Sequence, residues 1–342
     1  MEEKKLLELY NYSLPKNLIA LKPASRADQA RLLVLEKKSG NISYDRFSNI
    51  LKFIPRNAVL VFNQTKVVPA RMVLKKETGG RVEILYVKRD GRRIYVLANR
   101  RLQIGSRVSI GGGTYFLVTG KEDNYYILGL KGSLGIEAVL KKYGKTPLPP
   151  YLKTSPLSEK ERKRRYQSIF AKYEGSIAAP TASLHFTPSL IAKIKKAGIR
   201  IKFVTLHVGL GTFLPLNDKI LKEGKLHSER YEIKKSVADF LDKTRREGRP
   251  IIAVGTTVAR ALESAFRSGH VGSLKGDTRL FIQEGYKFKL ISGLITNFHL
   301  PKSSLLMLVA ALVGREKMFN IYNQAIKKKL KFYSFGDGML IY

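Results

Sequence analysis

The sequence predicts an α/β protein that also contains a separate strand-rich segment, and three observations support this. Beyond residue 187, probable strands and helices alternate, which is typical of a layered α/β sheet. Between residues 67 and 130, short alternating apolar runs are separated by turns without a helix between them, which indicates a small β-barrel or sandwich. The 342 residues suffice for two domains, and 44% of them are hydrophobic, as in globular proteins.

The first elements are a short helix and a few strands. The pattern predicts a helix over Glu2–Leu9, extended chain that includes Arg31–Leu35, and a short apolar strand over Val59–Phe62. Turn signals such as Gly111–Gly113 then divide the next segment, because glycine accepts backbone angles that other residues avoid. The strands expected there are Ala70–Leu74, Val82–Val87, Ile94–Leu97, Arg107–Ile110, Tyr115–Val118 and Tyr125–Leu130.

A proline-rich segment follows the strand-rich part. A short helix over Ile136–Tyr143 ends at Gly144, and Pro147–Pro150 comes directly after it. We interpret residues 147–150 as a domain boundary, because proline-rich chain continues neither a helix nor a sheet. The basic stretch Lys160–Arg165 then leads to Tyr166.

Clear capping signals open the α/β part. Helix Ser189–Ala197 has Thr187 as its N-cap, Pro188 at its first position and Gly198 after its end. Strand Ile201–His207 follows, and ligands of such sheets usually lie at the carboxyl ends of strands. The remaining expected elements are strand Ile251–Val254, helices Val258–Arg267, Ser303–Val313 and Arg315–Leu330, and strands Phe332–Phe335 and Met339–Ile341.

Charge and cysteine content limit the functional class. The chain has 63 Lys and Arg against 27 Asp and Glu, a formal net charge of +36. Such an excess favours nucleic acid or another polyanion, although a lysine-rich lineage would show it too. Without cysteine there is no disulfide framework, thiolate metal site or cysteine nucleophile. Met1–Tyr10 does not resemble a secretion signal, and the longest apolar run, Leu305–Val313, is about half a membrane span. We therefore expect a soluble, cytoplasmic protein without a membrane partner.

Four of the five histidines lie in dense polar blocks of the C-terminal half. Core packing requires only apolar residues at the right period, so it does not explain these strings. Gly, Thr, Ser and His at the ends of probable strands can instead direct backbone and polar groups at a small ligand. The blocks are Gly175–Thr187, Val204–Leu216, Leu226–Tyr231 and Ile295–Met307.

Two strand ends are candidate binding sites. His207 is followed by Gly209 and Gly211, whose backbone can approach a ligand closely; the alternative is a tight loop with a structural histidine. The turn at residues 255–257 ends a strand and opens a helix, where free amides and the helix dipole favour a carboxylate, phosphate or sugar hydroxyl. Turns of this kind also occur for steric reasons alone.

Titratable residues supply further candidates. His227 and Glu229 share one face if the chain is extended, and a carboxylate can orient an imidazole or raise its pKa. Such pairs are also common on surfaces. Asp337, between two glycines, fits either a hairpin turn or the neighbourhood of a cationic ligand. The histidine spacings match no helical pair or compact finger, so we expect no metal site.

Taken in order, strings along nearly the whole chain resemble the S-adenosylmethionine:tRNA ribosyltransferase-isomerase family of queuosine biosynthesis. Gln64, Ser183, Leu226 and Phe335 depart from the residues typical of that family, namely Asp, Gly, Met and Tyr. Because the first change removes a charge, we give Gln64 no catalytic role. The matching strings are Tyr12–Pro15, Leu18–Ala20, Asn63–Val67, Ala70–Arg71, Pro147–Tyr151, Arg165–Gln167, the four histidine blocks, Val254–Arg260 and Ser334–Leu340.

The resemblance implies a fold, a reaction and its partners. The expected fold is a layered α/β catalytic domain formed by residues 1–65 and 147–342, with a small antiparallel β-barrel domain inserted over residues 66–146. The expected enzyme moves and isomerises the ribosyl moiety of S-adenosylmethionine onto 7-aminomethyl-7-deazaguanine at the wobble position of tRNA. Adenine and methionine leave, and epoxyqueuosine forms. S-adenosylmethionine is then a co-substrate, tRNA is the partner, no cofactor is permanently bound, and we expect a monomer.

Under this interpretation we assign roles to the residues singled out above. Candidate acid–base residues are His207, His299, His227 and Glu229. Candidate contacts to S-adenosylmethionine are His185, Gly209, Thr256, Thr257 and Asp337, the last facing the sulfonium. Candidate tRNA contacts are Lys66, Arg71, Arg164 and Arg165, with Tyr166 or Phe298 stacking on an unstacked base. An RNA-binding protein without chemistry and an S-adenosylmethionine-dependent methyltransferase are the competing functions.

Overall fold

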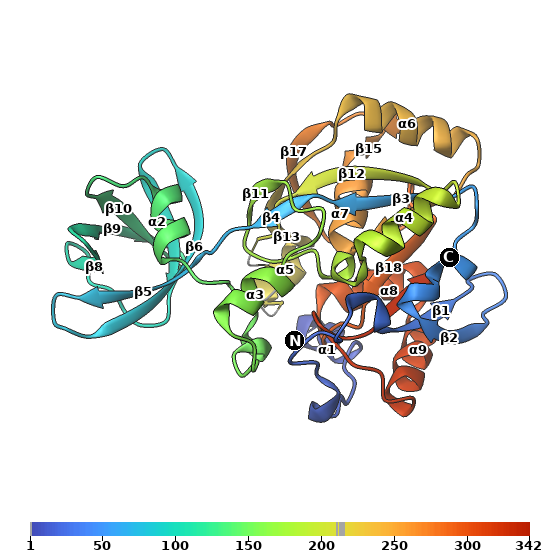
Figure 1. Cartoon of the computed structure of the whole chain (residues 1–342), viewed down its shortest axis with the longest axis horizontal. Helices are drawn as coiled ribbons and strands as arrows, with labels where there is room; N and C mark the ends of the chain where they lie inside the picture. Colours follow the sequence, from blue (N-terminus) through green and yellow to red (C-terminus); the bar gives the residue numbers. More distant parts are fainter. Residues whose placement is uncertain (1, 210, 212–215) are drawn as a thin grey trace. The chain divides into compact units, whose positions relative to one another are not determined.

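The computed structural model describes residues 2–209, 211 and 216–342. Backbone contacts divide the chain into two compact units, whose helices and strands are labelled in Figure 1. The sheet unit comprises residues 1–66, 150–156 and 167–342, and the barrel unit comprises residues 67–149 and 157–166. Residues 157–166 thus cluster with the barrel although they follow the expected boundary, and the domain limits at 66 and 147 stay a prediction.

The sheet unit is built on a nine-stranded sheet of order β17-β13-β12-β3-β14-β18-β19-β1-β2. Its centre consists of four parallel strands, β12, β3, β14 and β18, and β19 runs antiparallel to β18. Every residue of β3, β14 and β18 is buried, which is why these strands are continuous apolar runs. The strand bounds are β1 Arg31–Leu35, β2 Ile42–Arg46, β3 Val59–Asn63, β12 Arg200–Leu206, β13 Lys225–Glu232, β14 Ile251–Val254, β17 Lys275–Leu280, β18 Gly293–Asn297 and β19 Gly338–Ile341.

Helices cover both faces of this sheet because alternate strand residues point to opposite sides. In β3, Val59 and Val61 pack with α6 and α7 in one core, while Leu60 and Phe62 pack with α4 in another. A third core joins β1 and β19 to α8 and α9. The α-helices of the sheet unit are α1 Glu2–Glu8, α4 Pro188–Lys196, α5 Asp218–Glu223, α6 Lys235–Arg246, α7 Thr256–Ala265, α8 Ser304–Val313 and α9 Arg315–Lys327.

The barrel unit is a closed antiparallel barrel of order β10-β7-β6-β5-β8-β9. This excludes the alternative of a sandwich, and together with the mixed sheet it confirms the predicted fold class. Ile136, Val139 and Leu140 of α2 pack into the barrel core. The bounds are β5 Arg71–Lys76, β6 Arg81–Asp90, β7 Arg93–Ala98, β8 Arg107–Gly111, β9 Thr114–Glu122, β10 Tyr125–Lys131, α2 Ile136–Tyr143 and α3 Glu159–Arg165.

The predicted element bounds needed two corrections. The helix expected over Val258–Arg267 starts earlier and ends at Ala265, because Phe266–Arg267 forms strand β15 and pairs with β16, His270–Val271. The segment Phe332–Phe335 does not form the expected strand. Only Phe332 makes a β-bridge, to Ile19, and the positive φ of Tyr333 ends the extended conformation directly after it. The remaining short elements are β4 Thr65–Val67, which pairs with β11 Tyr173–Ser176, and the 3-10 helices η1 Lys16–Leu18, η2 Ala27–Gln29, η3 Phe47–Lys52, η4 Pro150–Leu152 and η5 Thr181–His185.

Part of the second histidine block, residues 210 and 212–215, lies outside the described residues. Within the part of the chain that is described, no helix is both long enough and apolar enough to cross a membrane.

Candidate active site at the carboxyl ends of the parallel strands

The four parallel strands end at one edge of the sheet and bring the predicted residues His207 and Thr256 there, together with two asparagines that were not predicted as site residues. His207 follows β12, Asn63 ends β3, Thr256 opens the helix after β14, and Asn297 ends β18. The strands are neighbours in the sheet, so these residues come from sequence-distant segments to a common edge.

His207 is held by the hydroxyl of Thr65, which is in turn bonded to the hydroxyl of Ser176. Its Nδ1 lies 2.9 Å from Oγ1 of Thr65, which lies 2.7 Å from Oγ of Ser176. Ser176 Oγ accepts a hydrogen bond of 2.8 Å from the amide of Val208, so this serine also fixes the chain directly after the histidine. A Cβ on Gly175 would lie 2.7 Å from the imidazole Nδ1, and its φ of 144° is unfavourable for other residues. A glycine at position 175 therefore leaves the space that the ring occupies.

The electrostatic surroundings keep His207 neutral. Burial lowers the pKa of this imidazole, and the nearby charge of Arg230 lowers it further, while Glu232 opposes the shift. The side chain is half-buried, and its Nδ1 lies beside the hydroxyl of Thr65. This combination of a fixed orientation and a neutral ring is what a general base requires.

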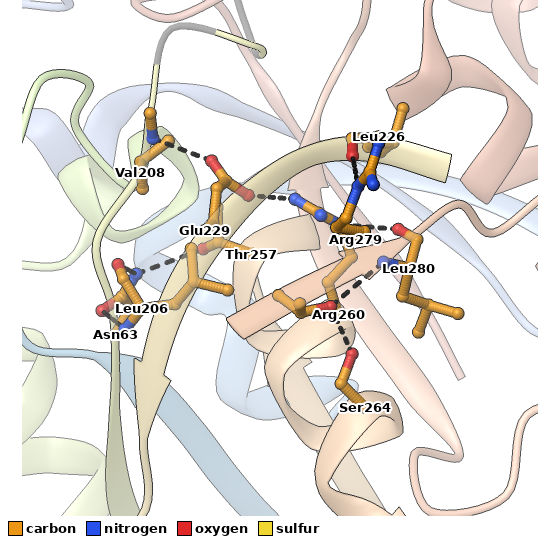
Figure 2. A network of polar contacts seen from close by, with 12 residues as sticks. Asn63, Leu206, Val208, Leu226, Glu229, Thr257, Arg260, Ser264, Arg279 and Leu280 are labelled. Carbon is orange, nitrogen blue, oxygen red and sulfur yellow. Dashed lines mark hydrogen bonds and ion pairs between the residues drawn. The ribbon is translucent and has the colours of Figure 1, made fainter. Parts of the chain in front are cut away.

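Asn63 aligns the adjacent strand end and was not recognised from the sequence. Its side chain is fully buried, donates to the carbonyl of Leu206 at 2.9 Å, and accepts from the amide of the same residue at 3.1 Å. Its Nδ2 also lies 3.4 Å from Oγ1 of Thr257 (Figure 2). Asn63 thereby connects β3 and β12 to the first turn of α7, where Thr256 and Thr257 are buried.

His185 is placed by a second polar group at the end of β18. Its ring stacks on Phe47, with the ring centroids 4.6 Å apart, and its Nε2 lies 3.1 Å from Nδ2 of Asn297. Thr181 donates to Oδ1 of Asn297, so the amide nitrogen is the donor toward the imidazole. Burial lowers the pKa of His185 to about 4. It is therefore a neutral, positioned side chain near pH 7.

His299 lies in an aromatic core and is 7% exposed. Its Nε2 lies 3.0 Å from Oγ1 of Thr296, its amide donates to the Tyr322 hydroxyl, and its carbonyl accepts from Tyr12. Burial lowers the pKa of His299 to about 3, so it cannot accept a proton near neutral pH. Phe298, predicted to stack on a base, has no exposed surface and packs on Tyr322 and Phe332.

His227 and Glu229 do share one face of β13, and both border a small cavity. Glu229 is only 4% exposed, forms an ion pair with Nη1 of Arg260 and accepts a hydrogen bond of 2.8 Å from the amide of Gly209 (Figure 2). Its two oxygens are thus engaged in holding α7 and the chain after His207. This geometry favours a positioning role for Glu229.

Asp337 also has a positioning geometry. One carboxylate oxygen accepts from the amide of Arg31 and the other from the amide of Lys331, both at 2.7 Å. Burial raises the pKa of Asp337, and these amides oppose the rise. The residue fixes the turn before β19 against β1, and we no longer assign it to the sulfonium.

The predicted tRNA contacts differ in how they are placed. Lys66 pairs with Glu174 at 2.8 Å with both side chains largely exposed, and Arg164 is exposed on α3. Arg71 instead serves the barrel fold, because it donates to Glu83 at 3.1 Å and to the carbonyl of Leu148 at 2.8 Å. Two more differ: Arg165 is half-buried, and Tyr166 is only 1% exposed, which leaves no free face for a base.

Sequence reasoning missed the residues that position others. Asn63, Thr65 and Ser176 stood in strings already singled out, but small polar residues give no sign of which partner they will meet. Tyr173 is 38% exposed on β11, the strand that also carries Ser176, and its ring lies against the Lys172 ammonium.

Among the residues with described positions, no three His, Asp or Glu side chains are grouped to hold a metal ion.

Known proteins resemble this chain over nearly its whole length. Residues 7–341 match the family described as queuosine biosynthesis protein. A relative from Carboxydothermus hydrogenoformans, named S-adenosylmethionine:tRNA ribosyltransferase-isomerase, is 46% identical over 98% of this chain and 99% of its own. A relative of the same name from Fusobacterium nucleatum is 45% identical over 97% and 96%. The crystal structure of an S-adenosylmethionine tRNA ribosyltransferase from Thermotoga maritima is 31% identical, covers 98% of this chain and 100% of its own, and has a TM-score of 0.57.

Proposed function

The chain belongs to the queuosine biosynthesis protein family, and from this premise we propose that it transfers and isomerises the ribosyl moiety of S-adenosylmethionine onto 7-aminomethyl-7-deazaguanine at the wobble position of tRNA. It is an enzyme of the ribosyltransferase-isomerase class that its relatives' names describe. The full-length match is the observation that carries the reaction. A net charge of +36 fits a polyanionic partner. We further propose that it works in the cytoplasm as a monomer without a permanently bound cofactor.

The proposed base is His207. The sulfonium of S-adenosylmethionine acidifies the adjacent C5′ protons, so a modest base can remove one of them. In the tautomer in which Nδ1–H donates to Thr65, 2.9 Å away, the imidazole Nε2 is left as the acceptor, and this is the tautomer that we propose. Adenine then leaves with a proton, the neutral amine of the nucleobase attacks, and methionine departs as the epoxide closes.

Other residues at the strand ends are proposed to bind and position. The free amides of the first turn of α7, at Thr256 and Thr257, would hold ribose hydroxyls. His185 would line the pocket as a neutral group, and Gly209 would allow close approach of the backbone. Tyr173 replaces Tyr166 and Phe298 as the proposed stacking platform, because its ring is exposed.

Product analysis tests this function directly. We expect the purified protein, given S-adenosylmethionine and tRNA that carries the 7-deazaguanine precursor, to release free adenine and methionine. Formation of S-adenosylhomocysteine would show a methyltransferase instead. Salt-dependent tRNA binding without any small product would show an RNA-binding protein without chemistry. Mass spectrometry of the small molecules separates the three outcomes.

The rate should fall on the acid side of neutrality. His207 must be neutral to accept a proton, and its pKa is lowered from the ordinary value of 6.5. kcat/KM is therefore expected to be level as the pH falls to about 6.5 and to decrease only below that value, as the imidazole becomes protonated. A pH profile of adenine release measures this. An acid limb that lies above pH 6.5 would assign the limiting proton to another group.

We propose that the tRNA backbone contacts a basic hollow on the barrel unit. The hollow has a volume of about 1120 Å³. The single acid of the lining, Glu77, lies 4.0 Å from Arg107. Lys76 donates to the carbonyl of Arg101 at 2.7 Å, Lys121 lies over the ring of Tyr126, and Arg100 and Arg101 are exposed. A wide hollow with such an excess of cations suits a phosphate backbone. Its charged lining is Lys76, Glu77, Arg100, Arg101, Arg107 and Lys121.

Charge reversal in this hollow should weaken tRNA binding. For the double variant Arg100→Glu/Arg101→Glu we expect a lower affinity and a shallower dependence of log K on log salt, by roughly 0.7–0.9 for each phosphate that is no longer neutralised. The matched control is Lys141→Glu/Lys142→Glu, two exposed cations of α2 in the same unit that do not line the hollow. Equal effects of both double variants would show that only overall charge matters.

A further inference from the structure

The proposed function leaves the amino-acid end of S-adenosylmethionine without a partner. Resting on that function, we propose that the cavity between Arg260, His227 and the first turn of α8 binds the carboxylate of this amino-acid moiety.

Arg260 is a buried guanidinium with one unused nitrogen. The residue is 4% exposed, its Nε donates to the carbonyl of Leu280 at 2.9 Å, and its Nη1 pairs with Glu229 (Figure 2). Its Nη2 is buried and has no hydrogen-bond partner among the described residues. Buried charged donors almost always have an acceptor, so an unused one indicates that the acceptor comes with a ligand.

The cavity beside this guanidinium has the size and lining for a single oxygen. Its volume is about 20 Å³, which is enough for one water-sized group. Gly211, His227 and Ser304 border it together with Arg260, and the other walls are largely apolar. The one carboxylate at its border, Glu229, already uses its two oxygens on Arg260 and Gly209. The carboxylate of the described lining therefore does not compete for Nη2.

The start of α8 adds a second source of positive potential. Ser303 caps this ten-residue helix, because its side chain accepts from the amide of Leu306 and its carbonyl accepts from that of Met307. Ser304 and Leu305 border the cavity. Their amides come before Met307, the first residue whose amide bonds to a carbonyl within the helix, so they have no intrahelical acceptor. Such amides and the positive end of the helix dipole favour an anion.

These features select a carboxylate over a phosphate. The cavity has room for one oxygen of a planar carboxylate, to which Nη2 of Arg260 can donate, while the amides at the start of α8 can donate to the other oxygen at the border of the cavity. A phosphate would bring more oxygens and up to two negative charges next to buried Glu229, where like charges repel. The amino-acid carboxylate is the single monoanionic group of S-adenosylmethionine that matches this requirement.

The test compares two ligands on two proteins. Calorimetry at physiological ionic strength would measure the affinities of the wild type and of Arg260→Lys for S-adenosylmethionine and for its decarboxylated analogue. For the wild type we expect S-adenosylmethionine to bind on the order of 10- to 100-fold more tightly than the analogue. In Arg260→Lys we expect this ratio to fall below about threefold, because lysine cannot contact Glu229 and the ligand in the same fork geometry.

Arg279→Lys is the matched control. Arg279 lies on β17, next to the strand β13 that carries Glu229, but its side chain is 51% exposed and pairs with Glu223. It should keep the wild-type ratio. Equal affinity of the wild type for both ligands would overturn the proposal, as would an equal loss of affinity for both ligands in Arg260→Lys. The wild-type comparison stands even if Arg260→Lys does not fold. Release of adenine from both compounds with equal KM would remove the carboxylate site and leave the proposed function intact.

Discussion

Replacing His207 with glutamine should lower the rate of adenine release by about 10²- to 10⁴-fold, the range expected for loss of a general base. Glutamine can still hydrogen-bond to Thr65, which lies 2.9 Å from the imidazole, but it cannot take up a proton. The affinity for tRNA should change little, because His207 is half-buried and its lowered pKa keeps it neutral, so it supplies no charge to the phosphate backbone. Single-turnover kinetics with saturating tRNA measures the chemical step.

His270→Gln is the matched control for this substitution. His270 is exposed at the start of β16, and its ring nitrogen lies 3.3 Å from the carbonyl of Ser268 in the preceding turn. The control should keep wild-type turnover. If His207→Gln also turned over at the wild-type rate, His207 would have no part in proton transfer, and the Thr65 and Ser176 contacts would be structural only.

Replacing Glu229 with alanine should lower the free energy of unfolding by about 3–5 kcal/mol, because it leaves a buried arginine without its counter-ion. Arg260 would retain only the carbonyl of Leu280, and the amide of Gly209 would lose its acceptor. Because Glu229 holds the chain after β12, turnover should fall as a consequence of this loss of structure. Denaturant unfolding followed by circular dichroism measures the change.

Glu232→Ala on the same strand provides the comparison. Glu232 is 46% exposed and pairs with Lys275 at 3.1 Å, so its loss should cost about 0–1 kcal/mol. In Glu229→Met/Arg260→Met both charges are removed, and much of the stability should return. A Glu229→Ala protein that is as stable as the wild type but inactive would restore Glu229 as an acid–base residue.

Much of the fold was predictable because local pattern and burial agree. Val59–Phe62 and Ile251–Val254 are apolar throughout, and both are indeed central strands buried on both faces. The local strand pattern did not decide between barrel and sandwich, because closure depends on pairs such as β5 with β8, which are distant in sequence; only the family resemblance favoured the barrel. Strand β13 escaped prediction because its exposed and buried positions are both rich in polar residues.

The sequence showed which polar segments contribute to the site, but it did not show the role of each side chain. His207 and His299 look alike in sequence, and the structure gives one a half-open position and the other an aromatic core. Glu263 similarly reads as a surface residue on its helix, yet it accepts from the amides of residues 289–291 and from the Tyr286 hydroxyl. Burial is a property of the assembled sheet, so a histidine or a carboxylate in a short string does not reveal it.

The place of β19 has a consequence for synthesis on the ribosome. Strands β1 and β2 are made first, but they join the remaining sheet only through β19, whose Gly338 lies opposite Leu32. The edge of β1 that pairs with β19 in the folded protein therefore stays without its strand partner while some 300 further residues are translated. Nascent chains of this enzyme should be a preferred cargo for chaperones that shield unpaired strand edges, until the last strand emerges from the exit tunnel.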